Sequence, residues 1–292
     1  MSNKSIMDRF KADLQLKSYA KRSIQSYQRA VRQLQNFCCK APEDISEEDL
    51  REYWLYCKDE LEWGSATLRI SYSGIKHFFT WTIKRDWPLL TEVKFERHAT
   101  LPVVLSIDEV RTILKALPEG QNRTFYEVTY SLGLRLTEAI TLQVRDIDSS
   151  RMQVHVHAGK GAKDRLVPMP KTTLQSLREY WKTHRNPKWI FPGLGRDGKG
   201  GRTAEKPVSA TTVQGALRGT VKRLGLKKHV HPHTFRHSYA THLIEAGVPV
   251  RHVQEYLGHQ TLASTTVYLH LTTAGKQESR SRINQLMRGV SS

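Results

Sequence analysis

The stretch HPHTFRHSYATHLIEAGVPVRHVQEYLGHQTLASTTVY, residues 231–268, predicts more about the fold than any other part of the chain. Its apolar residues recur at steps of three and four, which indicates helices rather than strands. We expect one helix from about His233 to Gly247 and a second that ends at Gly258, because glycine often follows the last helical turn. A third short helix would carry Tyr268. The stretch therefore predicts short helices joined by tight turns.

The polar side chains of this stretch suit chemistry on a phosphate. His233 and Arg236 stand three residues apart, so they share one face of a helix. His259 lies at the loop where the second helix stops, and Tyr268 lies nine residues further on. A guanidinium binds phosphate oxygens, while imidazoles and a phenol exchange protons.

Two other interpretations of these residues stay open. His233, His237 and His242 could ligate a metal, since the first two have helical i, i+4 spacing. However, no H-E-x-x-H glutamate and no cysteine pair completes such a site. Tyr268 could equally be a packed aromatic residue, which is the commoner role of a tyrosine.

A second candidate cation lies upstream, in GLRLTEAITLQVRDID, residues 133–148. Arg135 stands between two leucines, just before a helix expected from about Thr137. An arginine between apolar neighbours is partly buried and must meet an anion. A salt bridge to Glu138 would satisfy it as well as a phosphate would, and the residues alone do not decide between them.

Residues 152–169, MQVHVHAGKGAKDRLVPM, alternate in polarity and then turn, which predicts an antiparallel hairpin. Its strands would be Met152–Val156 and Leu166–Pro168, with Lys160 between two glycines at the tip. A lone lysine at a hairpin tip is usually only solvated. Further on, residues 192–207 are rich in glycine and charge and predict a mobile loop. Gly193, Gly198 and Lys199 imitate a phosphate-binding P-loop, but a glycine replaces its Ser/Thr and no strand–loop–helix frame surrounds it.

The first ninety residues predict a separate helical domain. Apolar stripes and a capping box at Ser46 indicate helices near residues 6–14, 24–37, 46–61 and 65–85. Trp87-Pro88 would end this region, and a second capping box at Ser106 restarts helical structure. We therefore expect a helical DNA-binding domain at 1–90, a linker at 91–104 and a second domain at 105–292. The fold class would be mainly α, with a small antiparallel β-sheet in the second domain.

The composition favours a polyanionic partner inside the cell. The chain has 292 residues and a formal net charge of +18, with Lys+Arg 46 against Asp+Glu 28. Such an excess points first to nucleic acid. Three cysteines without metal-site spacing fit a reducing compartment, and the polar N-terminal residues do not look like a signal peptide. We expect a cytoplasmic protein.

The motifs occur in a recognisable order: G-L-R-x-x-E at 133–138, G-K-G-x-K-x-R at 159–165, H-x-x-R at 233–236, L-G-H at 257–259, and then Tyr268. This order resembles the tyrosine recombinases, or phage integrases, and especially the bacterial Xer recombinases and integron-type integrases. The chain lacks the extra helical insertion expected of an integron integrase. Its first ninety residues resemble the family's SAM-like core-binding domain, so the two domains would form a clamp around DNA.

The resemblance implies a role for each matched residue. Tyr268 would attack a backbone phosphate and form a 3′-phosphotyrosine bond, and Arg135 and Arg236 would bind the non-bridging oxygens. Lys160 would protonate the leaving 5′-oxygen. His233 would exchange protons with the tyrosine, and His259 would hydrogen-bond the phosphate. Glu138 would support these groups without touching the substrate. Neither a metal nor a cofactor would be needed.

The resemblance also implies double-stranded DNA sites as partners and a synaptic tetramer on the DNA, and it leaves accessory DNA-bending proteins open. A short apolar face in the tail, residues 272–292, could dock on a neighbouring subunit. The protein would lie in the bacterial cytoplasm, associated with the nucleoid. Two other functions compete with this one: a non-catalytic, sequence-specific DNA-binding protein and a metal-dependent nuclease.

Overall fold

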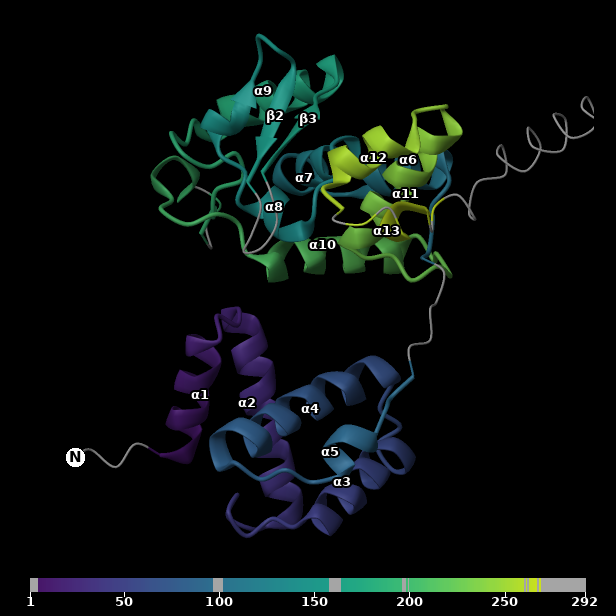
Figure 1. Cartoon of the computed structure of the whole chain (residues 1–292). Coiled ribbons are helices and arrows are strands. Elements are labelled where there is room, and N and C mark those ends of the chain that lie inside the picture. The colour runs from purple at the N-terminus through teal and green to yellow at the C-terminus, as the bar shows by residue number, and fades with distance from the viewer. Residues whose placement is uncertain are drawn as a thin grey trace, which may run out of the picture. The chain divides into compact units, whose positions relative to one another are not determined.

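The computed structural model describes residues 5–96, 102–157, 164–195, 198, 200–259, 261, 263–266 and 268. The chain divides into two compact units, Met1–Thr100 and Leu101–Ser292, which are drawn in Figure 1. The first unit is helical, and the second combines helices with a small antiparallel sheet. The expected fold class is therefore confirmed. Among the helices that the structure describes, none is both long enough and apolar enough to cross a membrane.

The described part of the first unit has six helical segments: α1 (Ile6–Leu16), α2 (Lys21–Cys38), α3 (Glu47–Asp59), α4 (Ser65–His77), the π-helical η1 (Phe78–Ile83) and α5 (Leu89–Glu92). The capping box expected at Ser46 is present, and it begins α3. The helix expected to run to residue 85 continues past α4 only as a π-helical turn. The apolar stripes meet in one core, in which Phe10, Leu34 and Phe78 are almost completely buried.

The second unit begins with α6 (Ile107–Ala116), α7 (Gln121–Ser131), α8 (Leu136–Ile140) and the 3-10 turn η2 (Val144–Asp146). After the sheet follow α9 (Lys171–His184), the 3-10 turn η3 (Gly200–Thr203), α10 (Ala210–Arg223), α11 (Pro232–Glu245), α12 (Val250–Leu257) and α13 (Ala263–Thr266). The two end residues of the segment expected as a loop at 192–207, Pro192 and Pro207, pair in an isolated antiparallel bridge.

Helix α7 is the centre of the second unit. It packs against α6, α8, α9, α10 and α11, and Figure 1 shows it among these elements. Its side chains Phe125, Tyr126 and Val128 have no exposed surface, since neighbouring helices cover α7 on several sides. A helix so enclosed holds the turn that follows it in a defined place, and Arg135 lies at the end of that turn.

The small sheet has the order β1-β2-β3, with β1 (Ile147–Asp148), β2 (Gln153–Val156) and β3 (Arg165–Pro168) all antiparallel. The hairpin of β2 and β3 was expected, whereas the two-residue β1 was not, because so short a strand shows no alternation. Val154, Val156 and Val167 face the core. The predicted hairpin tip, including Lys160, lies outside the described residues.

Candidate active site

Arg135 lies where α7 passes into α8. Its backbone N–H donates to Oε2 of Glu138 at 2.8 Å, so this glutamate caps the first turn of α8. The guanidinium donates to Oε1 of Glu138 at 2.7 Å and to the carbonyl of Gly258 at 3.2 Å. The salt bridge considered as an alternative is therefore present. About a third of the side chain, 34%, still reaches solvent, which leaves Arg135 able to meet a second anion.

Glu138 binds two arginines. Arg165, on β3, donates to both carboxylate oxygens of Glu138, at 2.9 and 2.7 Å, in the paired geometry that suits a guanidinium and a carboxylate. Both side chains are only 7% exposed. Burial raises the pKa of Glu138, but the hydrogen bonds and charges of Arg165 and Arg135 outweigh it and lower that pKa to about 2. Glu138 therefore stays ionised and holds these cations together.

Arg236 comes from α11 and is buried at 4% side-chain exposure. It donates to the carbonyl of Gly133 at 2.7 Å and to that of Leu257 at 2.5 Å. Burial, followed by the charge of Arg135, lowers the pKa of Arg236 to about 9, at which it is still protonated at neutral pH. We call Arg135, Glu138, Arg165 and Arg236 the arginine network.

Two glycines allow the arginine network to form. Gly133 has φ +59°, and a Cβ there would lie 2.6 Å from Cδ1 of Tyr239. Gly258 has φ +63°, ends α12, and a Cβ there would lie 2.9 Å from Cδ of Arg165. Both positions therefore favour glycine through backbone conformation and through lack of space. The carbonyls at the end of α12 also carry the negative end of the helix dipole, which favours the nearby guanidinium groups.

Tyr268 lies just beyond α13, which ends at Thr266 instead of continuing through the tyrosine as expected. Its side chain is 3% exposed and packs with Ala240, Val253 and Leu257. Its hydroxyl is hydrogen-bonded to Nδ1 of His237 at 2.9 Å. Burial raises the pKa of Tyr268, and the charges of Arg236 and Arg135 act in the opposite direction. The nucleophile candidate is thus packed and also close to the arginine network.

The two histidines predicted for the site also lie near these groups. The ring of His259 stacks on that of Tyr268, with centroids 6.2 Å apart, and its Nδ1 is 2.8 Å from Oγ1 of Thr265. Burial, then the charge of Arg236, lowers the pKa of His259 to about 4. His233 is more exposed, but partial desolvation and the charge of Arg236 still lower its pKa.

Five of the six predicted catalytic residues therefore come from four separate stretches that meet in the described structure: Arg135, His233, Arg236, His259 and Tyr268. The sixth, Lys160, lies outside the described residues. Two residues of this site were not among the candidates. Arg165 is the last residue of the quoted G-K-G-x-K-x-R motif. His237 was considered only as a metal ligand, although it directly follows Arg236 on α11.

The alternative metal site at His233, His237 and His242 does not form among the described residues. The only group of three close His, Cys, Asp or Glu ligands found there lies elsewhere, at His155, His157 and Asp164. His242 instead pairs with the hydroxyl of Tyr130 through Nδ1 at 2.8 Å.

Similarity to known proteins agrees with this geometry. Residues 104–274 match the profile of the Phage integrase family, and residues 6–89 match the Phage integrase N-terminal SAM-like domain. The chain belongs to the phage integrase family of tyrosine recombinases. A "Tyrosine recombinase" of Thermosipho africanus is 32% identical over 275 residues, covering 89% of this chain and 93% of its own. "Tyrosine recombinase XerD" of Corynebacterium glutamicum is 38% identical over 192 residues, 62% of this chain and 60% of its own.

The fold of this recombinase is also found among solved structures. A lambda integrase dimer bound to a COC′ core site has a TM-score of 0.73 at 18% identity, covering 92% of this chain and 77% of that chain. The recombinase is thus an enzyme of site-specific DNA recombination, and nothing in these relatives favours the non-catalytic alternative.

Proposed function

We propose that the recombinase cuts and rejoins duplex DNA through Tyr268. Its phenol oxygen attacks a backbone phosphate, forms a 3′-phosphotyrosine bond and releases a 5′-hydroxyl; rejoining reverses these steps. The observation that carries this proposal is the position of Tyr268, which is hydrogen-bonded to His237 and stacked on His259. There the charges of Arg236 and Arg135 oppose the rise that burial causes in its pKa. Because the phosphotyrosine keeps the energy of the broken bond, no ATP is needed, and the guanidinium groups supply the charge that metal ions supply in many phosphoryl-transfer enzymes.

Arg135 and Arg236 would bind the phosphate, and Arg165 would position them. A guanidinium has five N–H donors, so each arginine can bind a phosphate oxygen while keeping its carbonyl contacts. Arg165 is bound to Glu138 through both terminal nitrogens and is 7% exposed, which suits a positioning residue better than a phosphate ligand.

His237 is the residue best placed to take the proton of Tyr268. Its Nδ1 lies 2.9 Å from the hydroxyl oxygen of Tyr268. Burial, followed by the charge of His233, lowers the pKa of His237 to about 4. It is therefore neutral at physiological pH, and its Nδ1 can accept the hydrogen bond of the phenol. The role in proton exchange expected of His233 stays part of the proposal, as do proton donation by Lys160 and phosphate binding by His259.

The described state also bears on when cleavage begins. Tyr268 and Arg236 are both almost completely buried. We propose that DNA binding moves Tyr268 out of its apolar contacts and exposes Arg236 to the scissile phosphate. Such a rearrangement would prevent the tyrosine from reacting before the recombinase is assembled on its site.

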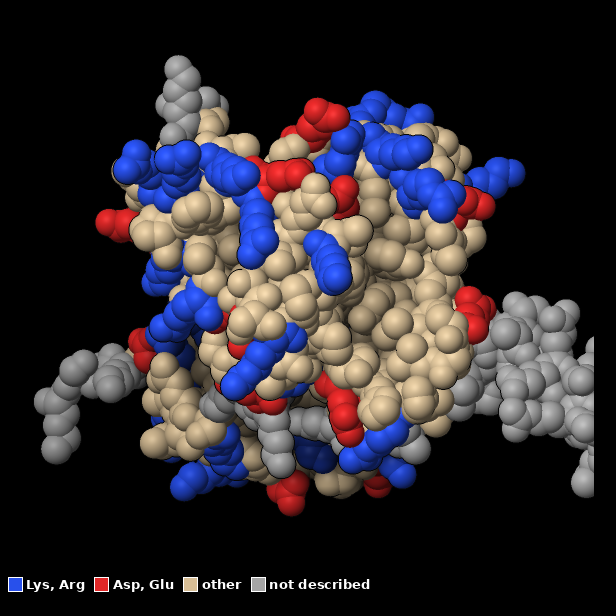
Figure 2. All heavy atoms as spheres, turned by 90° about the horizontal axis from the view of Figure 1, so that it is seen from above, with Lys and Arg blue, Asp and Glu red and all other residues tan. Residues whose placement is uncertain are grey.

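The partner would be double-stranded DNA, held in a clamp between a domain at 1–90 and one at 105–292, with four copies in the synapse. The support is the net charge of +18 and the DNA-bound lambda integrase dimer. Figure 2 shows Lys and Arg side chains scattered over one face, among acidic and uncharged ones. DNA affinity should then fall with salt at a log–log slope of roughly 0.9 per neutralised phosphate, and a salt-insensitive affinity would contradict the clamp. With such a substrate, the protein would lie in the bacterial cytoplasm, associated with the nucleoid.

The test is covalent capture. The recombinase is incubated with a nicked recombination site in EDTA, and the protein–DNA adduct is measured on a denaturing gel. We expect an adduct with the wild type and none with Tyr268→Phe, which keeps the packing of the ring. Cleavage that EDTA abolishes and a divalent metal ion restores would overturn the proposal. So would an adduct that survives Tyr268→Phe.

A further inference from the structure

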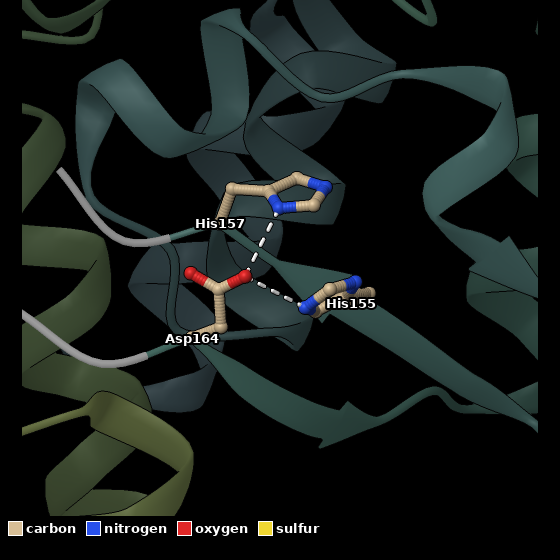
Figure 3. Close-up of side chains that lie close together, drawn as sticks. All are labelled: His155, His157 and Asp164. Atoms are coloured by element: carbon tan, nitrogen blue, oxygen red, sulfur yellow. Dashed lines mark hydrogen bonds and ion pairs between the residues drawn. The ribbon is translucent and has the colours of Figure 1, made fainter.

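A second cluster of reactive side chains lies at the loop end of the β2–β3 hairpin, and the proposed chemistry assigns no role to its residues. Nε2 of His155 and Nδ1 of His157 lie 3.0 and 3.2 Å from the same oxygen, Oδ2 of Asp164. One ligand atom from each of the three residues lies within 4.8 Å of the others. Figure 3 shows both rings directed at that carboxylate.

The register of the hairpin explains this convergence. Val156 pairs with Arg165, so the next pair outward is His157 and Asp164, which lie opposite each other. His155 stands two residues before His157 and therefore projects from the same face of β2. Neighbours directly across a hairpin, and diagonal ones, are within reach of each other. The three side chains are brought together by backbone pairing rather than by flexible loops.

A buried carboxylate determines which nitrogen of His157 is available. Nε2 of His157 is 2.9 Å from Oδ1 of Asp146, whose side chain is 3% exposed. The other oxygen of Asp146 accepts from the backbone N–H of Gln143 at 2.9 Å. A carboxylate only accepts, so Nε2 carries a proton in either charge state of the ring. Nδ1 faces the carboxylate of Asp164, so a cation there, either a second ring proton or a metal ion, joins the two groups.

We propose that His155, His157 and Asp164 form a binding site for a divalent transition metal of the Zn²⁺ class. Two imidazoles and one carboxylate are a ligand set that such ions bind, with bonds of about 2.0–2.2 Å. Ligands at those bond lengths around a tetrahedral ion stand about 3.4 Å apart, close to the two measured separations. Asp146 supplies the carboxylate behind a ligating histidine that metal sites use to hold the ring.

The position of the site gives the ion an effect on the rest of the hairpin. His157 and Asp164 flank residues 158–163, the segment that contains Lys160. A metal bound by both joins the two ends of that segment. Arg165 follows Asp164 and binds Glu138, so the ion would also reinforce the strand end that supports the arginine network.

The test measures Zn²⁺ binding by the full-length, metal-stripped protein with isothermal titration calorimetry, and needs no DNA. We expect the wild type to bind one equivalent of Zn²⁺ more than His155→Ala or Asp164→Asn. Their side chains are 43% and 51% exposed, so both variants should fold. Asp146→Asn should keep the site but weaken it by roughly 10–100-fold. His252→Ala, which removes an exposed histidine of α12, is the matched control and should bind as the wild type does.

A second readout is thermal. Zn²⁺ should raise the Tm of the wild type and of His252→Ala but not that of His155→Ala, since an ion stabilises only the state that binds it. The proposal is overturned when His155→Ala and Asp164→Asn take up as many equivalents as the wild type with the same affinity. Because the cleavage assay contains EDTA, failure of this site would leave the proposed recombination chemistry untouched.

Discussion

The arginine network and the pair of Tyr268 and His237 belong to one site but are held in different ways. Each arginine of the network has at least two hydrogen bonds, and these join a buried glutamate and backbone carbonyls from separate helices. The phenol of Tyr268 is held by a hydrogen bond to one histidine, on a ring packed in a small apolar cluster. The phosphate-binding half is therefore preorganised, whereas the nucleophile can move at lower cost.

The largest effect is expected from the network itself. Arg236→Ala should lower the rate of DNA cleavage by about a thousand-fold, the upper end of what loss of one preorganised donor costs. Arg236→Lys should recover only part of this, because one ammonium cannot bind two carbonyls and a phosphate at once. Single-turnover cleavage of a nicked site measures the rate. Wild-type cleavage by Arg236→Ala would show that the network does not bind the phosphate.

Glu138 should contribute stability with a defined pH dependence. Its pKa is about 2 in the folded protein against an ordinary 4.5, so the contribution is complete above pH 4.5 and is lost as the pH falls toward 2. The difference corresponds to about 3 kcal/mol. Glu138→Gln should therefore be less stable than the wild type by about that amount at pH 6, as measured by urea unfolding.

The same two proteins should approach each other in stability at pH 2.5, where Glu138 begins to be protonated. A stability difference that does not change between pH 6 and pH 2.5 would mean that the glutamate acts through packing rather than through its charge.

His237 tests the other half of the comparison. His237→Ala should lower the cleavage rate by roughly a hundred-fold, the lower end for a general base, since water can replace the imidazole in part. His242→Ala is the matched control, because His242 lies on the same helix and pairs with a different tyrosine, Tyr130. It should cleave as the wild type does. If His233→Ala loses activity and His237→Ala does not, proton exchange belongs to His233 alone.

The smallest effect is expected at Gly258. Gly258→Ala should lower the free energy of unfolding by about 1–2 kcal/mol from its left-handed backbone alone. A further cost should arise because its Cβ meets Arg165, which is fixed on Glu138. Gly247→Ala is the control: its φ is +84° with no atom within 4 Å of the new Cβ. Equal losses in the two variants would show that Arg165 moves freely and that the network is less rigid than its contacts indicate.

The positions of several helices and of the hairpin were determined by local sequence. Period and capping residues predicted α3, α6 and α12, because helix formation and termination depend on neighbours within a few residues. Alternation predicted the β2–β3 hairpin for the same reason. Residue type and spacing singled out Arg135, Arg236, His259 and Tyr268. Their roles came from a motif order that resembles a family, and these roles stay predictions.

Only the tertiary structure decided how these residues meet. The pairing of Arg165 with Glu138, and of His237 with Tyr268, joins residues 27 and 31 positions apart, which no helix or strand period relates. The metal ligands depend on the register of two strands, and the orientation of His157 depends on a buried Asp146. Such contacts form where helices and strands pack against each other. Burial is the physical reason, because a buried charged group needs a partner, and the packing of the elements determines which group is close enough to be that partner.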